Sequence, residues 1–201
     1  MSGQLSDRNG MNSKIMPKVT LFSGNTIVSS GAPEVVGQFA KELISAKGSS
    51  GVLLFDDANG RQLDVDLRNG HIPGVHDVQE VPPTKGRGRP KLGVVSREVT
   101  LLPVHWQWLS SQPGGASATL RRLVNGARET HSEKDKVRVS QNAAFSFMNA
   151  MAGDLPGFEE VTRALFADDR ATFLTLTEHW PEQVADYAGK LAGDAFSEET
   201  P

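Results

Sequence analysis

A cluster of positive charge spans residues 85–91, where four cations alternate with small or rigid residues. Glycine lets a backbone lie close to the floor of a DNA minor groove, and proline keeps the chain extended. The narrow groove of A·T-rich DNA concentrates negative potential, which favours inserted guanidinium groups. The cluster therefore predicts a minor-groove contact. Its residues are Lys85, Gly86, Arg87, Gly88, Arg89, Pro90 and Lys91.

Residues 87–90 resemble the AT-hook of chromatin-associated proteins, a motif that is disordered until it binds DNA. The resemblance implies that Arg87 and Arg89 enter an A·T-rich minor groove, while Lys85 and Lys91 bind phosphates. Two other interpretations stay open at this point. The composition of the segment also fits a solvated linker, or a contact to RNA or another polyanion.

The formal charge changes sign along the chain. Residues 1–80 carry 7 basic and 9 acidic side chains, residues 81–152 carry 11 and 4, and residues 153–201 carry 3 and 11. The three balances, −2, +7 and −8, give the net charge of −3. A basic block of this kind favours binding of a polyanion. The alternative is that the basic middle docks on the acidic end within one fold.

The sequence gives little indication of a catalytic, metal-binding or cofactor-binding site. The absence of cysteine excludes disulfides, thiolate metal sites, iron–sulfur clusters and cysteine nucleophiles. The five histidines show no i, i+4 pair of the metal-binding type, and Asp56, Asp57, Asp64 and Asp66 fit a solvated turn and strand face better than a Mg²⁺ site. No phosphate-binding glycine loop, nucleophile elbow or dinucleotide fingerprint is present. We therefore predict no catalytic residues, no metal and no cofactor.

The composition is that of a globular protein, with 38% hydrophobic and 22% charged residues in 201. No apolar run approaches the ~18 residues that a membrane span needs. Residues 1–17 lack the apolar core of a secretory signal and are predicted to form a disordered leader. We expect a cytoplasmic protein that does not contact a membrane.

Two predicted units flank the basic cluster. Before it, apolar segments at 19–22 and 26–29 predict a hairpin, a helical period runs to Lys47, and strands are expected at 52–55 and 62–67. Residues 18–69 are thus predicted to form a ββαββ module of an α+β fold, and residues 70–93 a basic Pro/Gly linker.

After the linker, residues 94–130 resemble the ribbon-helix-helix dimers in the order of a strand over 94–101, a helix after Pro103 and a second helix capped by Ser117. The resemblance implies a homodimer. Neither face of the strand fits base contacts, so we expect the unit to dimerise or pack; an internal strand of one α+β domain is the alternative. Arg97 adds a cation, and the amide end at Ser117 is predicted to contact phosphate. Of Trp106 and Trp108, which face different sides of their helix, one is expected in the core.

The remaining third is acidic and rich in Phe and Ala. A charged connector is expected over 130–138, followed by an acidic helical region over 139–195 with helices near 141–151, 157–166, 169–178 and 181–192. Its apolar residues recur at helical spacing and are predicted to form the core, Phe145 and Phe166 included.

The chain from about residue 19 to residue 192 resembles an uncharacterised bacterial family, domain of unknown function 2239. The family has no established activity, so the resemblance implies none. One departure is Val104-His105, where a basic residue is expected after Pro103. The resemblance rests on VLLFDD at 52–57, GRQ at 60–62, GRGRPKLGVVSREVTLLP at 86–103, QPGGAS at 112–117 and MNAMAGDLPGFE at 148–159.

From these patterns we predict a DNA-binding accessory or regulatory protein, nucleoid-associated within the cytoplasm, whose partner is double-stranded DNA, preferably A·T-rich. The alternative is a non-catalytic interaction or scaffold module whose basic linker binds an acidic partner or its own acidic tail. The candidate DNA-binding residues are Lys85, Arg87, Gly88, Arg89, Pro90, Lys91 and Arg97, with Ser117 as a phosphate contact.

Overall fold

The computed structural model describes residues 17–75 and 96–196. It contains the predicted hairpin, in which β1 (Val19–Ser23) pairs antiparallel with β2 (Thr26–Gly31). Gly24 lies in the turn with φ +58°, a left-handed conformation that glycine adopts without a steric penalty. Two short apolar segments separated by a glycine turn were therefore sufficient to predict this hairpin.

The helix and strands that follow complete a sheet. α1 (Pro33–Lys47) begins with proline in its first turn, where no amide hydrogen is needed. β3 (Val52–Asp56) and β4 (Gln62–Leu63) then join the hairpin in a four-stranded antiparallel sheet of order β2-β1-β3-β4. Together with the helices described below, this sheet gives the mixed α+β fold that the sequence predicts.

β4 ends earlier than the predicted strand over 62–67, because the chain turns at Asp66. The Asp66 amide donates to the His71 carbonyl at 2.7 Å, and the Asp66 carboxylate accepts from the Arg68 amide at 2.9 Å. The turn brings Ile72 beneath α1, where it is 1% exposed and packs with Val36. Ile72, which the sequence analysis assigns to the linker, is thus part of the apolar cluster of the module.

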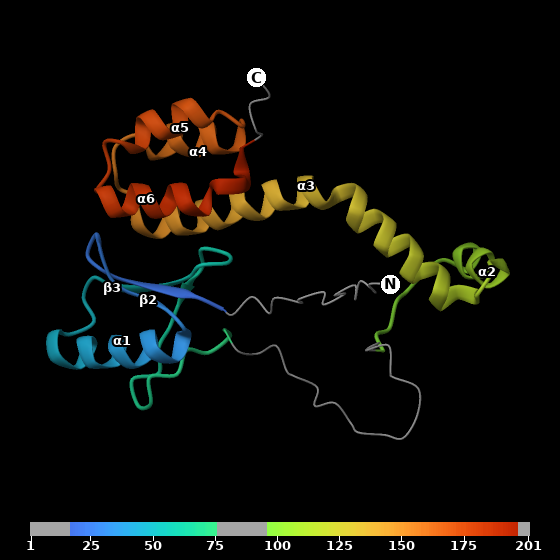
Figure 1. Ribbon diagram of the computed structural model, residues 1–201, viewed down its shortest axis with the longest axis horizontal. Coiled ribbons are helices and arrows are strands. Elements are labelled where there is room, and N and C mark those ends of the chain that lie inside the picture. The colour runs from blue at the N-terminus through green and yellow to red at the C-terminus, as the bar shows by residue number, and fades with distance from the viewer. Residues whose placement is uncertain (1–16, 76–95, 197–201) are drawn as a thin grey trace, which may run out of the picture.

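Helices cover both faces of the sheet (Figure 1). Val19 and Leu21 of β1 belong to the cluster beneath α1, whereas Phe22 belongs to the cluster formed with the C-terminal helices. Because successive side chains of a strand point to opposite faces, both sets are buried at once. This burial on two sides explains why β1 and β3 are nearly continuous apolar runs.

α3 (Gly115–Met151) is a single helix of 37 residues, about 55 Å long. It includes residues 130–138, so the predicted charged connector is wrong. No glycine or proline interrupts the chain from 127 to 151, and charged side chains pair along the helix at i, i+3. The charges that made this segment resemble a connector are instead the solvated surface of a helix.

The C-terminal helices lie close to their predicted positions, with α4 (Phe158–Phe166), α5 (Arg170–Thr177), α6 (Glu182–Leu191) and a 3-10 turn, η1 (Gly193–Ala195). Trp180 anchors the group by donating from Nε1 to the Pro156 carbonyl at 3.0 Å. Phe145 and Phe166 contact each other but are 36% and 49% exposed, so their predicted place in the core is wrong. Phe145 lies two positions before the buried Phe147, which turns it to the far side of α3.

Residues 96–130 form a projection that we call the arm. It consists of residues 96–102, α2 (Pro103–Ser111) and the first turns of α3, and it lies at the end of α3 remote from α4, α5 and α6 (Figure 1). Residues 96–102 have no regular secondary structure, so the part of the predicted strand over 94–101 that is described is not formed. Within the described ranges this segment has no neighbouring strand to complete a hydrogen-bonded ladder.

Two further details of the arm differ from expectation. The N-cap of α3 is Gly114, in a left-handed conformation and without a side-chain cap, and Ser117 is the third residue of the helix. Trp106 and Trp108 are 39% and 50% exposed, so neither is in the core, whereas Leu109 is buried at the contact of α2 with α3. Two helices thus follow Pro103 in the predicted order, whereas residues 96–101 form no strand.

Candidate functional site

The structure locates two of the predicted site residues. Arg97 is exposed in the extended start of the arm, and Ser117 is exposed in the first turn of α3. The two are thus on the same projection of the molecule. The remaining predicted residues, Lys85, Arg87, Gly88, Arg89, Pro90 and Lys91, lie outside the described residues.

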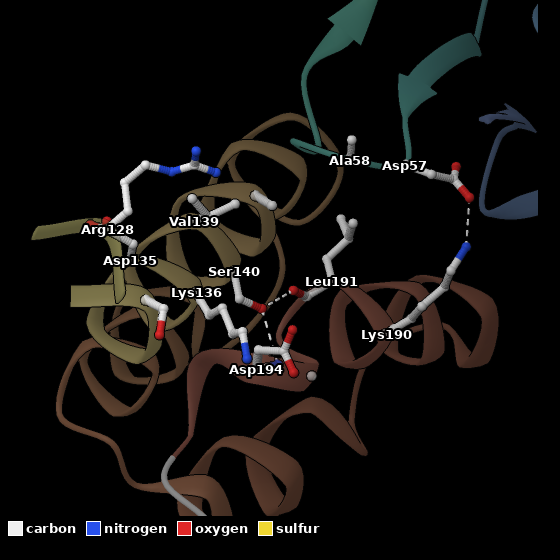
Figure 2. Close-up of a pocket in the computed structure, with 13 residues that line it drawn as sticks. Asp57, Ala58, Arg128, Asp135, Lys136, Val139, Ser140, Lys190, Leu191 and Asp194 are labelled. Atoms are coloured by element: carbon white, nitrogen blue, oxygen red, sulfur yellow. Dashed lines mark hydrogen bonds and ion pairs between the residues drawn. The ribbon is translucent and has the colours of Figure 1, made fainter. Parts of the chain in front are cut away.

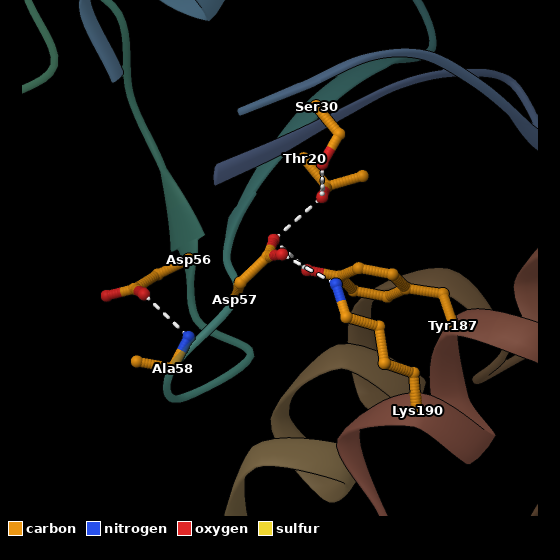
Figure 3. A network of polar contacts seen from close by, with 7 residues as sticks. All are labelled: Thr20, Ser30, Asp56, Asp57, Ala58, Tyr187 and Lys190. Atoms are coloured by element: carbon orange, nitrogen blue, oxygen red, sulfur yellow. Dashed lines mark hydrogen bonds and ion pairs between the residues drawn. The ribbon is translucent and has the colours of Figure 1, made fainter. Parts of the chain in front are cut away.

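A network of side-chain hydrogen bonds is centred on Asp57, directly after β3 (Figure 3). The backbone amide of Asp57 donates to the Lys18 carbonyl at 3.0 Å, which fixes the turn beside β1. Asp56, its neighbour, points away and accepts from the amide of Ala58 at 2.8 Å. The carboxylates of Asp56 and Asp57 therefore accept hydrogen bonds from different groups and do not point to a common cation site.

Three side chains donate to the Asp57 carboxylate. Oδ1 accepts from Thr20 Oγ1 at 2.7 Å and from the Tyr187 hydroxyl at 2.8 Å, while Oδ2 accepts from Lys190 Nζ at 2.6 Å. Since Thr20 donates to Asp57, its oxygen accepts from Ser30 at 2.9 Å. The network joins β1, β2 and the end of β3 to α6, across 130 positions of sequence from Asp57 to Tyr187.

The network fixes the charge state of its members. Burial by itself raises the pKa of Asp57, but the hydrogen bonds from Lys190, Thr20 and Tyr187 and the charge of Lys190 outweigh it, so this pKa lies below its ordinary value. Burial, together with the charge of Asp57 and its hydrogen bond, raises the pKa of Tyr187. Asp57 is therefore an ionised acceptor and Tyr187 a neutral donor. This arrangement stabilises the contact between the sheet and α6.

A groove of about 650 Å³ opens beside this network, between α3, the end of α6 and the turn after β3 (Figure 2). At the floor of the groove, the Ser140 hydroxyl links α3 to the end of α6. It donates to the Leu191 carbonyl and accepts from the Asp194 amide at 3.2 Å. Arg128 and Asp135 line the wall formed by α3. The groove is thus built from surfaces that come together only in the folded chain.

Charges of both signs line the groove, and most of them are paired. Lys136 contacts Glu133 at 2.9 Å, and Asp135 contacts Arg138 at 2.8 Å, both within α3. Lys190 is paired with Asp57. Among the residues described, no three His, Asp or Glu side chains are grouped so as to hold a metal ion. The groove therefore has no concentrated charge of one sign for a small ion.

The basic residues of the arm are not paired with the acidic helices, although one of them, Arg128, lines the groove. Arg121, Arg122 and Arg128 are exposed on α3, and no ion pair of the described residues involves them. Arg121 and Arg128 are seven residues apart, two helical turns, and so lie on one face. Arg97 lies at the start of the same projection.

Tyr187 and Lys190 were missed by the sequence analysis. They are three residues apart on α6 and so lie on one face, and Lys190 Nζ is 5.1 Å from the centre of the Tyr187 ring. That i, i+3 spacing was a sequence signal that Tyr187 and Lys190 could contact the same group. The partner, Asp57, belongs to another part of the chain, and no local pattern identifies it.

Fold and site together define a mixed α+β protein, in which a sheet is covered on both faces and a long helix carries a basic arm away from acidic helices. None of the helices within residues 17–75 and 96–196 is long and apolar enough to cross a membrane. The chain belongs to a family described as uncharacterised proteins conserved in bacteria (DUF2239), whose model matches residues 18–192. The resemblance found in the sequence is thereby confirmed. No curated protein matches the chain, and no solved structure does.

Proposed function

We propose that this protein binds double-stranded DNA, with Arg87 and Arg89 in an A·T-rich minor groove and Lys85 and Lys91 on the flanking phosphates. In this proposal Gly88 and Pro90 keep the backbone close to the groove and extended. The proposed role is that of an accessory or regulatory protein at the bacterial nucleoid.

The observation that carries the proposal is the separation of charge along α3. The basic arm projects from one end of this helix, and the acidic α4, α5 and α6 pack near the other (Figure 1). Arg121 and Arg122 make no ion pair with those helices among the described residues; of the basic middle, Lys136 lies near enough to Asp194 to feel its charge. Unneutralised cations on a projecting helix favour contact with a polyanion.

The arm supplements the basic cluster with phosphate contacts. The cluster ends at Lys91, five residues before the described start of the arm at Ser96, so the two are neighbours along the chain. Arg97 and the guanidinium groups of Arg121 and Arg122 are then available to the DNA backbone. Ser117, in the first turn of α3, is the proposed phosphate ligand at a helix N-terminus.

Fluorescence anisotropy on A·T-rich and G·C-rich duplexes across a salt series tests the proposal. We expect tighter binding to A·T-rich DNA, with an affinity that falls steeply with salt. Arg87→Ala/Arg89→Ala is expected to remove the A·T preference, whereas Arg163→Ala/Arg170→Ala, which removes the same charge from exposed positions on α4 and α5, leaves binding unchanged. Absence of binding to both duplexes at low salt would overturn the proposal.

The exposed tryptophans of the arm favour a second candidate, a non-catalytic interaction or scaffold module. Trp106 and Trp108 are side chains of the kind that dominate protein interfaces. In that case the basic cluster binds an acidic protein surface, and equal, weak affinity for both duplexes is the expected result. Titration with a polyglutamate peptide then distinguishes the two functions.

A further inference from the structure

The arm carries an apolar surface that nothing in the described residues covers. Seven of the fifteen exposed large apolar side chains in these residues lie between positions 96 and 130. Leu102 and Val104 are each 61% exposed, and Val104, Trp108 and Leu123 line one groove. We call these seven residues the apolar arm surface. They are Val99, Leu102, Val104, Trp106, Trp108, Leu123 and Val124.

This surface is hollowed where α2 meets α3. A groove of about 410 Å³ lies between Val104 and Trp108 of α2 and Leu120 and Leu123 of α3. Its lining is almost wholly apolar, with His105 as the polar member. Two short stretches of helix with Leu109 as their buried apolar side chain form a poor core by themselves. The arm therefore needs a further apolar surface to complete it.

The start of the arm also lacks a partner for its backbone. Residues 96–102 are without helix or strand, and Val99 and Thr100 are β-branched residues that favour strands. An extended segment with unpaired amide and carbonyl groups is a template for pairing with another strand. The described sheet offers none, since its order ends at β2 and β4 in the body of the molecule.

We propose that the occupant is a second copy of this chain. Its α2 and the start of its α3 pack on the apolar arm surface across a two-fold axis, and the two copies of residues 96–102 pair as antiparallel strands. The segment that lacks a partner and the groove that lacks an occupant are adjacent, so one isologous contact satisfies both. The proposal concerns assembly alone and holds whether or not the protein binds DNA.

Charge and composition favour a copy of the same chain over other occupants. α2 contains no Asp, Glu, Lys or Arg, so two copies meet there without repulsion between like charges. Residues 1–16 offer only Leu5 and Ile15 as branched aliphatic side chains, and residues 197–201 offer none. These two terminal segments are too polar to fill an apolar groove of this size. Residues 76–95 include Leu92, Val94 and Val95, and if they were the occupant the chain would be a monomer in the sedimentation experiment below.

The area agrees with that of a stable dimer. An exposed side chain of the size of Val, Leu or Trp at these exposures offers on the order of 100 Å². Because Trp106 and Trp108 face different sides of α2, one face takes in six of the seven residues and supplies roughly 600 Å² per copy, towards the ~800 Å² per partner of a standard interface. Backbone pairing over 96–102 and the rest of the groove add to it.

Sedimentation equilibrium of the full chain, without DNA, tests the proposal. We expect a mass of twice 21.7 kDa, and more than about tenfold weaker association for Leu123→Glu, because a carboxylate buried without a partner is strongly unfavourable. Val35→Glu is the matched control, since Val35 is 68% exposed on α1, outside the arm. A monomer in the micromolar range, an assembly larger than a dimer, or a dimer insensitive to Leu123→Glu would each overturn the proposal.

Cross-linking provides a second measurement that does not depend on a destabilised variant. The chain has no cysteine, so a single thiol introduced by Val99→Cys, at the middle of residues 96–102 where the two copies of the residue lie opposite each other, bonds only to its counterpart in another copy. We expect a disulfide-linked dimer on mild oxidation, and none for Ser45→Cys on the exposed face of α1. A failure of both measurements, with A·T-specific binding retained, would overturn the dimer and leave the DNA proposal standing.

Discussion

Asp57 and Tyr187 lie 130 positions apart, and the Tyr187 hydroxyl donates to Asp57 Oδ1 at 2.8 Å. This hydrogen bond links the end of a strand to the helix that covers the sheet. Lys190, one turn further along α6, donates to the second carboxylate oxygen. These hydrogen bonds thus link the N-terminal module to the C-terminal helices. Because they depend on the ionised Asp57 carboxylate, their contribution to stability depends on pH.

Asp57→Asn is expected to lower the free energy of unfolding by about 2 kcal/mol near neutral pH, since hydrogen bonds to a charged acceptor are lost. The folded-state pKa of Asp57 is lowered, so its ionised form contributes stability above about pH 4 and this contribution is lost as the pH falls further. The difference between wild type and variant should therefore narrow in acid. Urea denaturation above and below about pH 4 measures this difference in the free energy of unfolding, and the exposed Asp154→Asn is the control. A difference that does not change with pH would contradict the stabilising role of ionised Asp57.

Tyr187→Phe removes the hydroxyl and keeps the ring, whose centre lies 4.7 Å from that of Phe147. We expect a loss of roughly 1–2 kcal/mol, from one hydrogen bond to an ionised group. Combined with Asp57→Asn in a double-mutant cycle, the two changes should be less than additive by at least ~0.5 kcal/mol. Strict additivity would show that the hydrogen bond contributes nothing in solution.

Phe147 and Phe145 give a matched pair on one helix. Phe147 is fully buried, with its ring centre 4.9 Å from that of Phe55, whereas Phe145 is 36% exposed. Phe147→Ala is expected to cost about 3–5 kcal/mol, through lost burial and a cavity. Phe145→Ala should cost about 1 kcal/mol, as is typical of a half-exposed position. Equal midpoints of thermal unfolding for the two variants would refute this placement of α3.

Gly60 marks a close approach between the turn after β3 and α3. It has φ +64°, and a Cβ atom there would meet the backbone carbonyl of Ala143, which has no room to move within the helix. Gly60→Ala is therefore expected to destabilise by more than about 3 kcal/mol, from strain and a backbone clash together. Gly74→Ala, with φ +85° and open space, should show the conformational strain alone, about 1 kcal/mol. Calorimetry measures the stability of the two variants. Equal losses of stability would rule out the close approach of Gly60 to Ala143.

Arg121→Ala/Arg122→Ala tests whether the arm contacts phosphate. Each lost phosphate contact lowers the slope of log affinity against log salt by ~0.9, so the pair should lower it by up to about 1.8. Because phosphate contacts carry no sequence information, binding to A·T-rich and G·C-rich duplexes should weaken alike. Anisotropy titrations measure the slope, with Arg163→Ala/Arg170→Ala as the charge-matched control. An unchanged slope would remove the arm from the DNA interface and leave the basic cluster as its sole proposed element.

Local patterns determined much of the fold. The glycine turn at Gly24 and the flanking alternation define the hairpin, and Pro33 and Gly48 bound α1. The break at Trp180-Pro181 separates α5 from α6 as expected. These features depend on backbone conformation and side-chain period within a few residues, which a sequence displays directly.

Only the tertiary structure decided the rest. Phe145 and Phe147 are alike in sequence, and the orientation of α3 over the sheet determines which one is buried. The charges over 130–138 are compatible with a loop or a helix, and the helix prevails because it continues a segment anchored in the core at Ser140 and Ala144. Asp57 lacked an identifiable partner until folding brought α6 against the sheet, since hydrogen bonds between distant segments depend on packing that no local spacing encodes.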